Sequence, residues 1–398
     1  MRKARIDKLH SFTGLALNLI CIALYFGYAE LVLEFTVLNG INNEIDHYVS
    51  MIFSEEEQKY AMQFKEDLNS LGERAVIVPG TTVYRYKPAK TKSFTINSFG
   101  FRGEELSPKQ KDEYRIVFFG NSKVLGYLIP DKDTIPYVVQ EKLRNHFKDK
   151  PAKITVFNFG TEAFNLQRSI ETAKLYHADL EADFVVFYSV AIDINESYLW
   201  GAAGLKPFAE GDKVPEIFLG RNESGNFRSN LFHIVKSSFF GDIYKFEINS
   251  AKHDLMSYPI PPLQLQFMHD FPPAYTASIK EITDYFKKLE IPSLIILPPI
   301  VQTKNPPSEH EKNLMFQREL YASGVNQFTK KSYLEIIKEV KALPDINVLD
   351  HSGVFNGMEE TVFFDGVHLT PTATKMSADK IADEIINILE SEHYLDKK

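Results

Sequence analysis

The chain has 398 residues, of which 44% are hydrophobic and 25% are charged, and its net charge is −8 at pH 7. This composition is that of an ordinary globular protein and excludes disorder over most of the length. No stripe of Lys and Arg interrupts the acidic balance, so nucleic acid is not an expected partner. The single cysteine, Cys21, excludes an intrachain disulfide, a cysteine-rich metal site and, from its position, a cysteine nucleophile.

The N-terminal residues predict a membrane anchor. An apolar run over residues 12–29 is just long enough to cross a bilayer core, and further apolar residues follow it. Four basic residues precede the run: Arg2, Lys3, Arg5 and Lys8. By the positive-inside rule, residues 1–10 stay in the cytoplasm, residues 11–38 span the membrane once, and the rest is exported to a bacterial periplasm or cell surface. A cleaved signal peptide is the alternative, because Gly27-Tyr28-Ala29 offers a small-x-small cleavage site.

Strand and helix signals alternate from residue 114 onward. Apolar runs predict strands at residues 115–119, 153–159, 184–188, 294–297 and 346–349. Amphipathic helices are predicted between them, and Thr370 and Pro371 mark the start of a last helix. Short apolar strands separated by amphipathic helices predict a parallel sheet with helices on both faces, a three-layer α/β/α sandwich over residues 114–392.

Two stretches do not follow this alternation. Residues 39–113 are interpreted as a membrane-proximal segment, with an acidic helix predicted over residues 55–71. Residues 197–274 are rich in aromatic residues and proline and show no clean period, so we interpret them as an insertion after the third strand. That insertion falls at the carboxyl end of the sheet, where such folds bind ligands. It forms either part of a substrate groove or an extra packing layer.

The first chemical signal is Gly120-Asn121-Ser122, directly after the first predicted strand of the sheet. A serine at the carboxyl edge of a parallel sheet can be exposed, and the helix that follows can supply N–H groups. Val124 stands where a Gly-x-Ser-x-Gly elbow has its second glycine, which argues against the α/β-hydrolase fold.

The second signal is Asp365-Gly366-Val367-His368, just before the last helix. A serine hydroxyl is a poor nucleophile until a base removes its proton, and that base needs a third group to orient it. An Asp and a His three residues apart can meet both needs from a single loop. The other interpretation is an acid placed at a helix N-terminus for structural reasons.

Together these elements resemble the SGNH (GDSL-type) hydrolase family, over roughly residues 95–390. The chain presents the family's blocks in order: Gly120-Asn121-Ser122, Asn158-Phe159-Gly160, Val190-Ala191-Ile192-Asp193, and Asp365 to His368. Asn97–Gly103 and Asp133–Pro136 resemble stretches of membrane-anchored members. The order and spacing of several blocks make the resemblance stronger than any single motif.

The resemblance implies a flavodoxin-like SGNH fold with Ser122, His368 and Asp365 as the triad. It also implies an oxyanion hole made by the N–H groups of Ser122 and Gly160. The family's third donor is an asparagine, where this chain has Ile192. Three further polar residues lie near these blocks and are auxiliary candidates: Asn121, which replaces the usual Asp, Asp193, which is retained, and Asn195, which is close enough to be a substitute donor.

The function implied is that of a membrane-anchored serine esterase or O-acyltransferase acting on ester groups, above all O-acetyl groups, of an envelope glycan. The acyl acceptor, water or a sugar hydroxyl, is left open, and so is a membrane-bound acyl-donor partner. No cofactor and no metal are expected, because the histidines show no metal-ligand spacing. His351 and Arg102 are expected to be structural, with Arg102 pinning the N-terminal segment to the sheet. The alternative is a catalytically impaired protein of the same fold that binds glycan or serves as a scaffold.

Overall fold

The computed structural model describes residues 45–71, 75–190, 192–194, 198, 259–260, 262–321, 323–391 and 394–397. The predicted cytoplasmic N-terminus, the anchor at 11–38, Asn195 and most of the predicted insertion lie outside these residues. Within the described ranges, no helix combines the length and the apolar character needed to cross a membrane. The described residues fall almost entirely in one compact unit made of Tyr48–Glu210 and Asp254–Lys398.

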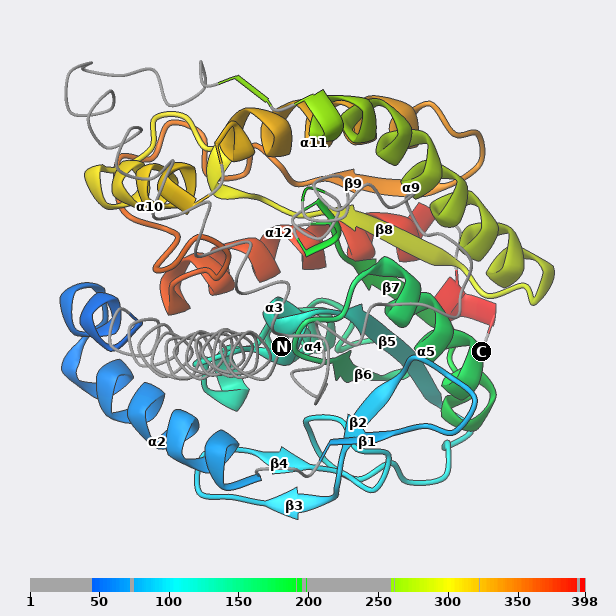
Figure 1. The fold of residues 1–398 in the computed structure, drawn as a ribbon. Helices are drawn as coiled ribbons and strands as arrows, with labels where there is room; N and C mark the ends of the chain where they lie inside the picture. The colour runs from blue at the N-terminus through cyan, green and yellow to red at the C-terminus, as the bar shows by residue number, and fades with distance from the viewer. Residues whose placement is uncertain are drawn as a thin grey trace, which may run out of the picture. The chain divides into compact units, whose positions relative to one another are not determined.

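A parallel sheet of five strands forms the centre of this unit (Figure 1). Its strands are β5 (Glu113–Gly120), β6 (Lys153–Gly160), β7 (Phe184–Tyr188), β8 (Ser293–Leu297) and β9 (Asn347–Asp350). They lie in the order β6-β5-β7-β8-β9, and every neighbouring pair is parallel. The prediction of a parallel sheet is therefore confirmed, and this strand order is the flavodoxin-like one.

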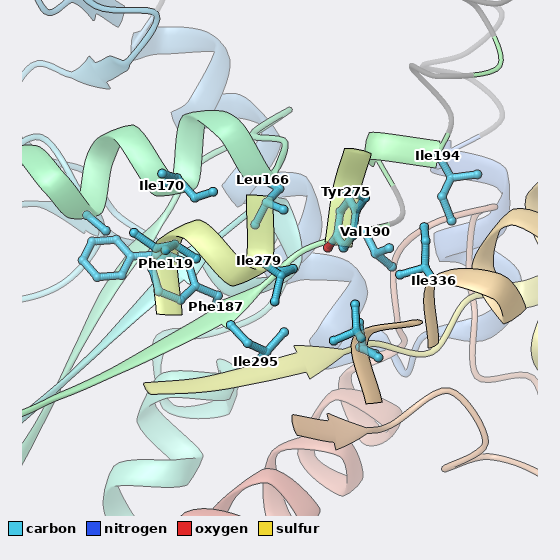
Figure 2. Close-up of a cluster of buried hydrophobic side chains, with 14 of the residues drawn as sticks. Phe119, Leu166, Ile170, Phe187, Val190, Ile194, Tyr275, Ile279, Ile295 and Ile336 are labelled. Carbon is cyan, nitrogen blue, oxygen red and sulfur yellow. The ribbon is translucent and has the colours of Figure 1, made fainter. Parts of the chain in front are cut away.

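Helices cover both faces of the sheet, because successive strand residues point to opposite sides. Val117 and Phe119 of β5 pack against one group of helices, and Ile116 and Phe118 pack against the other. The first group is α5 (Leu166–Leu180), α9 (Pro262–Lys288) and α11 (Val325–Lys341); the second is α4 (Ile135–His146) and α12 (Pro371–Ser391). Figure 2 shows the first core, where Phe119 and Phe187 of the sheet meet Ile279 of α9. The chain is thus an α/β/α sandwich.

Helix α9 corrects the predicted extent of the insertion. It begins at Pro262, so residues 262–274 belong to a helix even though Pro272 and Pro273 lie inside it. A proline inside a helix removes a backbone hydrogen bond and normally bends or ends it. Here Phe267, Phe271 and Tyr275, spaced four residues apart, are buried in the core and stabilise the helix through tertiary packing.

Smaller elements surround the sheet. They are α2 (Glu55–Leu71), β1 (Ala75–Ile77), β2 (Tyr84–Tyr86), β3 (Ala89–Lys90), β4 (Thr95–Ile96), α3 (Ser122–Leu125), η2 (Asp131–Asp133), η4 (Val301–Thr303), α10 (Glu309–Tyr321) and η5 (Tyr394–Lys397). The predicted acidic helix is confirmed as α2. Strands β1 and β2 form one antiparallel hairpin, and β3 and β4 form another.

Arg102 joins the segment before the sheet domain (residues 39–113) to that domain. Its buried guanidinium donates to the carbonyls of Leu125 and Gly126 at 3.0 and 2.7 Å, and to the carbonyl of Ile129 at 2.8 Å. It also pairs with Asp131. These acceptors lie at the end of α3 and in the turn that follows it, so Arg102 holds the C-terminal end of the helix that begins at Ser122.

Candidate active site

Ser122 is the first residue of α3 and follows the end of β5 by two positions. Asn121 caps this short helix, because its side chain accepts from the Lys123 N–H at 3.0 Å. Gly120 is required by close packing: a Cβ atom there would lie 2.5 Å from the Tyr188 carbonyl oxygen. The auxiliary residue Asn121 therefore positions the helix, and Ser122 is held at the carboxyl edge of the sheet with only 6% of its surface exposed.

The structure brings Ser122, His368 and Asp365 together. His368 Nε2 lies 2.8 Å from Ser122 Oγ, and His368 Nδ1 lies 2.7 Å from Asp365 Oδ2. The other oxygen of Asp365 accepts from the backbone N–H groups of Val367 and His368, at 2.8 and 2.5 Å. A carboxylate can only accept, so Nδ1 of the imidazole carries the proton and Nε2 is left to accept from the Ser122 hydroxyl.

Asp365 is held in its charged form. Burial raises the pKa of its carboxyl, but the charge of His368 and the hydrogen bonds from the His368 ring, the His368 N–H and the Val367 N–H outweigh burial and lower it to about 2. An ionised carboxylate fixes the orientation of the imidazole and stabilises the imidazolium that forms when His368 takes a proton.

Two aromatic rings hold the His368 imidazole. The Tyr127 ring centroid lies 4.8 Å away at an interplanar angle of 33°, and the Phe364 centroid lies 5.8 Å away at 18°. Phe64 packs edge-on against Tyr127, and Phe53 packs edge-on against Phe364. Phe53 and Phe64, which precede the sheet domain, thus support the catalytic candidates, a role that the sequence motifs did not reveal.

Gly160 does not act as the sequence predicts. Its N–H donates to the Asn158 side-chain oxygen at 2.9 Å, so this donor is already used. The Asn158 side chain in turn donates to the Val124 carbonyl at 2.8 Å, which ties β6 to α3. The glycine is needed because a Cβ atom at residue 160 would lie 2.2 Å from the Leu125 nitrogen. The Ser122 N–H, by contrast, has no acceptor among the described residues.

The loop after β6 lies beside the site. Ala163 in this loop has φ +53°, a left-handed conformation that is uncommon outside glycine, and its N–H has no acceptor in the described part of the chain. Tyr86 donates to the Glu162 carboxylate at 2.9 Å, and Tyr84 donates to the Glu162 carbonyl. Burial raises the pKa of Glu162, against the hydrogen bond from Tyr86 and the charge of His368, which both lower it. Strand β2 therefore fixes this loop.

The predicted third block has an unusual backbone conformation and lacks a side-chain donor at residue 192. Val190 has φ +145°, a conformation that favours glycine, and Ile192 offers no side-chain donor. Asp193 is buried and accepts from the Leu166 N–H and the Ser189 hydroxyl, both at 2.7 Å. Burial raises its pKa to about 6, against the effect of these bonds. Asp193 therefore ties the loop after β7 to the start of α5.

Two basic side chains near Asp365 were not singled out from the sequence: Lys123, which is buried, and Arg318, which is partly buried. Lys123 donates to the Pro299 carbonyl at 3.0 Å, and burial lowers the pKa of its ammonium to about 7 although Asp365 acts in the opposite direction. Arg318 donates to the Gly366 carbonyl at 3.4 Å, and burial lowers its pKa to about 10. Both cations favour the ionised form of Asp365. Among sequence features, only the place of Lys123 directly after Ser122 could have indicated either of these two residues.

The remaining candidates are structural or unsupported. His351 is buried with its Nε2 3.0 Å from the Ser377 hydroxyl, and burial lowers its pKa to about 4. Among the described residues, no group of three or more His, Cys, Asp or Glu side chains could hold a metal ion.

Comparisons with known proteins found no matching family model and no matching curated protein. Similar solved structures include a member of the lipolytic protein G-D-S-L family from Veillonella parvula DSM 2008, which is 12% identical with a TM-score of 0.37 over 68% of this chain and 97% of that one. An acetylxylan esterase from Geobacillus stearothermophilus is 12% identical, with a TM-score of 0.36 over 68% and 94%. A lipase/acylhydrolase from Enterococcus faecalis is 15% identical, with a TM-score of 0.36 over 70% and 96%.

The pKa of Asp365 predicts how stability depends on pH. Its folded pKa, about 2, lies below the ordinary value of 3.8, so the carboxylate stabilises the fold above pH 4, and that contribution is lost as the pH falls through 2. The difference corresponds to about 2 kcal/mol. We expect Asp365→Asn to lower the free energy of unfolding at pH 6 by about that amount, and the gap to wild type to close toward pH 2. Urea unfolding followed by circular dichroism measures it.

Asp379→Asn is the matched control, because the Asp379 side chain is 54% exposed and pairs only at the surface. This variant should follow wild type at every pH. A gap for Asp365→Asn that stays constant from pH 6 to pH 2 would contradict the assignment of Asp365 as the ionised partner of His368.

Proposed function

We propose that this protein is a serine esterase or O-acyltransferase. The observation that carries the proposal is the continuous hydrogen-bond chain from Ser122 Oγ to His368 at 2.8 Å and from His368 to Asp365 at 2.7 Å. A nucleophile, a base within reach of it and a carboxylate that orients the base are the parts that acyl transfer requires. The resemblance of the motifs to the SGNH hydrolases supports the same chemistry.

The reaction would run in two halves. His368 Nε2 takes the Ser122 hydroxyl proton while Oγ bonds to the ester carbonyl carbon, and the carbonyl oxygen becomes an oxyanion. The tetrahedral intermediate then breaks its bond to the alcohol oxygen, which receives the proton from His368, and an acyl-Ser122 ester remains. In the second half, water or a sugar hydroxyl gives its proton to His368 and its oxygen bonds to the acyl carbon. The bond from that carbon to Ser122 Oγ then breaks, and His368 returns the proton to Oγ.

The oxyanion would be stabilised by few donors. The Ser122 N–H is available, whereas the Gly160 N–H is used by Asn158. The Ala163 N–H is our candidate for a second donor, because left-handed backbone at a non-glycine residue clusters at functional sites. Ile192 supplies none, and the loss of one such donor costs about 100- to 1000-fold in rate. We therefore expect slow hydrolysis of simple esters.

The same donor shortage supports a second candidate function. A protein that kept the fold and lost efficient catalysis would bind glycan or act as a scaffold. Ile192 in place of a side-chain donor favours this candidate, whereas the intact Ser122–His368–Asp365 geometry favours the enzyme. The two are separated by a test for activity that depends on Ser122.

Kinetics of three forms of the full chain in detergent would decide between them. Wild type should hydrolyse an aryl acetate slowly, and Ser122→Ala should abolish that activity. Ile192→Asn should raise kcat/KM by about 10-fold or more if the carboxamide reaches the oxyanion. Circular dichroism of each variant serves as the folding control. Wild-type hydrolysis that equals that of Ser122→Ala would reject the enzyme and leave the scaffold.

We further propose that residues 11–38 anchor the protein in a membrane, that the domain after them is exported, and that the substrate is an O-acetylated envelope glycan. Support comes from the apolar run, the basic residues before it and the sequence resemblance. An acyl donor held by a membrane partner is compatible with this layout.

The orientation is testable with a reporter fused after residue 393. A reporter that works only outside the cytoplasm should be active, and one that works only inside should be silent. Changing all four basic residues before the apolar run to acids should mix the two orientations. Full activity of the cytoplasmic reporter in the unchanged protein would exclude an exported domain.

A further inference from the structure

A small cavity opens beside the nucleophile. Its volume is about 10 Å³, which is room for one water-sized group. Ser122 and His368 form one side of it. The rest of the lining is mainly apolar, from Tyr127, Ile129, Ile135 and Leu369, and is completed by Lys123 and Thr374. A much larger cavity of about 940 Å³ lies at the opposite, amino-terminal edge of the sheet, where Tyr114, Ser293 and Asn347 line it. Of these two cavities in the described part of the chain, the small one is lined by Ser122 and His368.

The walls of the small cavity are held firmly. Ile129 is 3% exposed, its N–H donates to the Gly126 carbonyl at 3.0 Å, and its carbonyl accepts from Arg102 at 2.8 Å. Ile135 opens α4 and is fully buried. The turn at Ile129 is bonded to the buried Arg102 guanidinium, and α4 is packed in the core, so neither wall can move outward without breaking these contacts. Closely packed interiors also resist added volume.

In the tetrahedral intermediate, the ester carbon bonded to Ser122 carries three other groups: the oxyanion, the leaving alcohol and the acyl chain. Its oxygen must face N–H donors, and the leaving alcohol must lie where His368 can protonate it. The acyl chain takes the remaining direction, and it needs apolar surroundings of its own size. Lys123 also lines the cavity, but its ammonium donates to the Pro299 carbonyl. The cavity therefore offers an apolar space for about one methyl group.

We propose that this cavity is the acyl pocket and that Ile129 and Ile135 limit the transferred group to acetyl. The inference rests on the proposed function and adds the residues that select the acyl chain. Each extra methylene must displace a side chain that Arg102 or the core holds in place. Discrimination by one or two methylenes in such a pocket is worth about 10- to 200-fold in kcat/KM.

The test is a chain-length series of p-nitrophenyl esters with the full chain in detergent, from acetate through butyrate to hexanoate. The rate of Ser122→Ala is subtracted at each length. Wild type should prefer acetate over butyrate by about 10-fold or more. Ile129→Ala should lower that preference by about 10-fold, mainly through faster turnover of butyrate. Ile135→Val should lower it less, and this milder change serves if Ile129→Ala does not fold.

Val139→Ala is the matched control, because Val139 lies on the same helix as Ile135 and is equally buried but does not line the cavity. It should lower the melting temperature and leave the acetate preference unchanged. Equal wild-type rates for acetate and hexanoate, or an unchanged preference in both isoleucine variants, would overturn the pocket and leave the esterase standing. If wild type cleaves none of the esters through Ser122, the proposed function fails as well.

Discussion

The site depends on one contact, the 2.8 Å approach of His368 Nε2 to Ser122 Oγ, which joins residues 246 positions apart. Ser122 and His368 are each held in position by their own set of contacts. The parallel register of β5 with its neighbours brings Ser122 to the carboxyl edge of the sheet, and Asn121 and Arg102 hold the two ends of α3. The hydrogen bond to Asp365 fixes the rotation of the His368 imidazole, and the rings of Tyr127 and Phe364 pack against it. Neither side moves without breaking several contacts, so the pair is preorganised.

The site is better equipped for proton transfer than for stabilisation of an oxyanion. The triad residues have short hydrogen bonds and a carboxylate that stays ionised, whereas the Gly160 N–H is used within the fold and Ile192 adds no donor. Preorganised donors usually contribute a large share of catalysis. Such a site suits slow turnover, or transfer between partners whose binding supplies part of the stabilisation. The tight apolar space beside Ser122 would restrict the acyl group more than the alcohol.

The sheet and the approach of Ser122, His368 and Asp365 to one another were predictable because both rest on local pattern. Apolar runs mark buried parallel strands, and the three-residue spacing of Asp365 and His368 lets one loop present both side chains. What was missed depends on tertiary contacts. The use of the Gly160 N–H follows from the direction of the Asn158 side chain, and α9 continues through Pro272 because its aromatic residues are buried. The support of Tyr127 by Phe64 joins segments that no motif connects.

The central claim, that Ser122 carries the acyl group, is tested most directly by trapping the intermediate. The full chain is mixed with an excess of aryl acetate, quenched in acid within the first turnovers, digested and examined by mass spectrometry. The account predicts one added acetyl group on Ser122, formed in wild type and absent from the folded Ser122→Ala variant. An acetyl group on a different residue that appears equally in Ser122→Ala, while the ester is turned over, would contradict it.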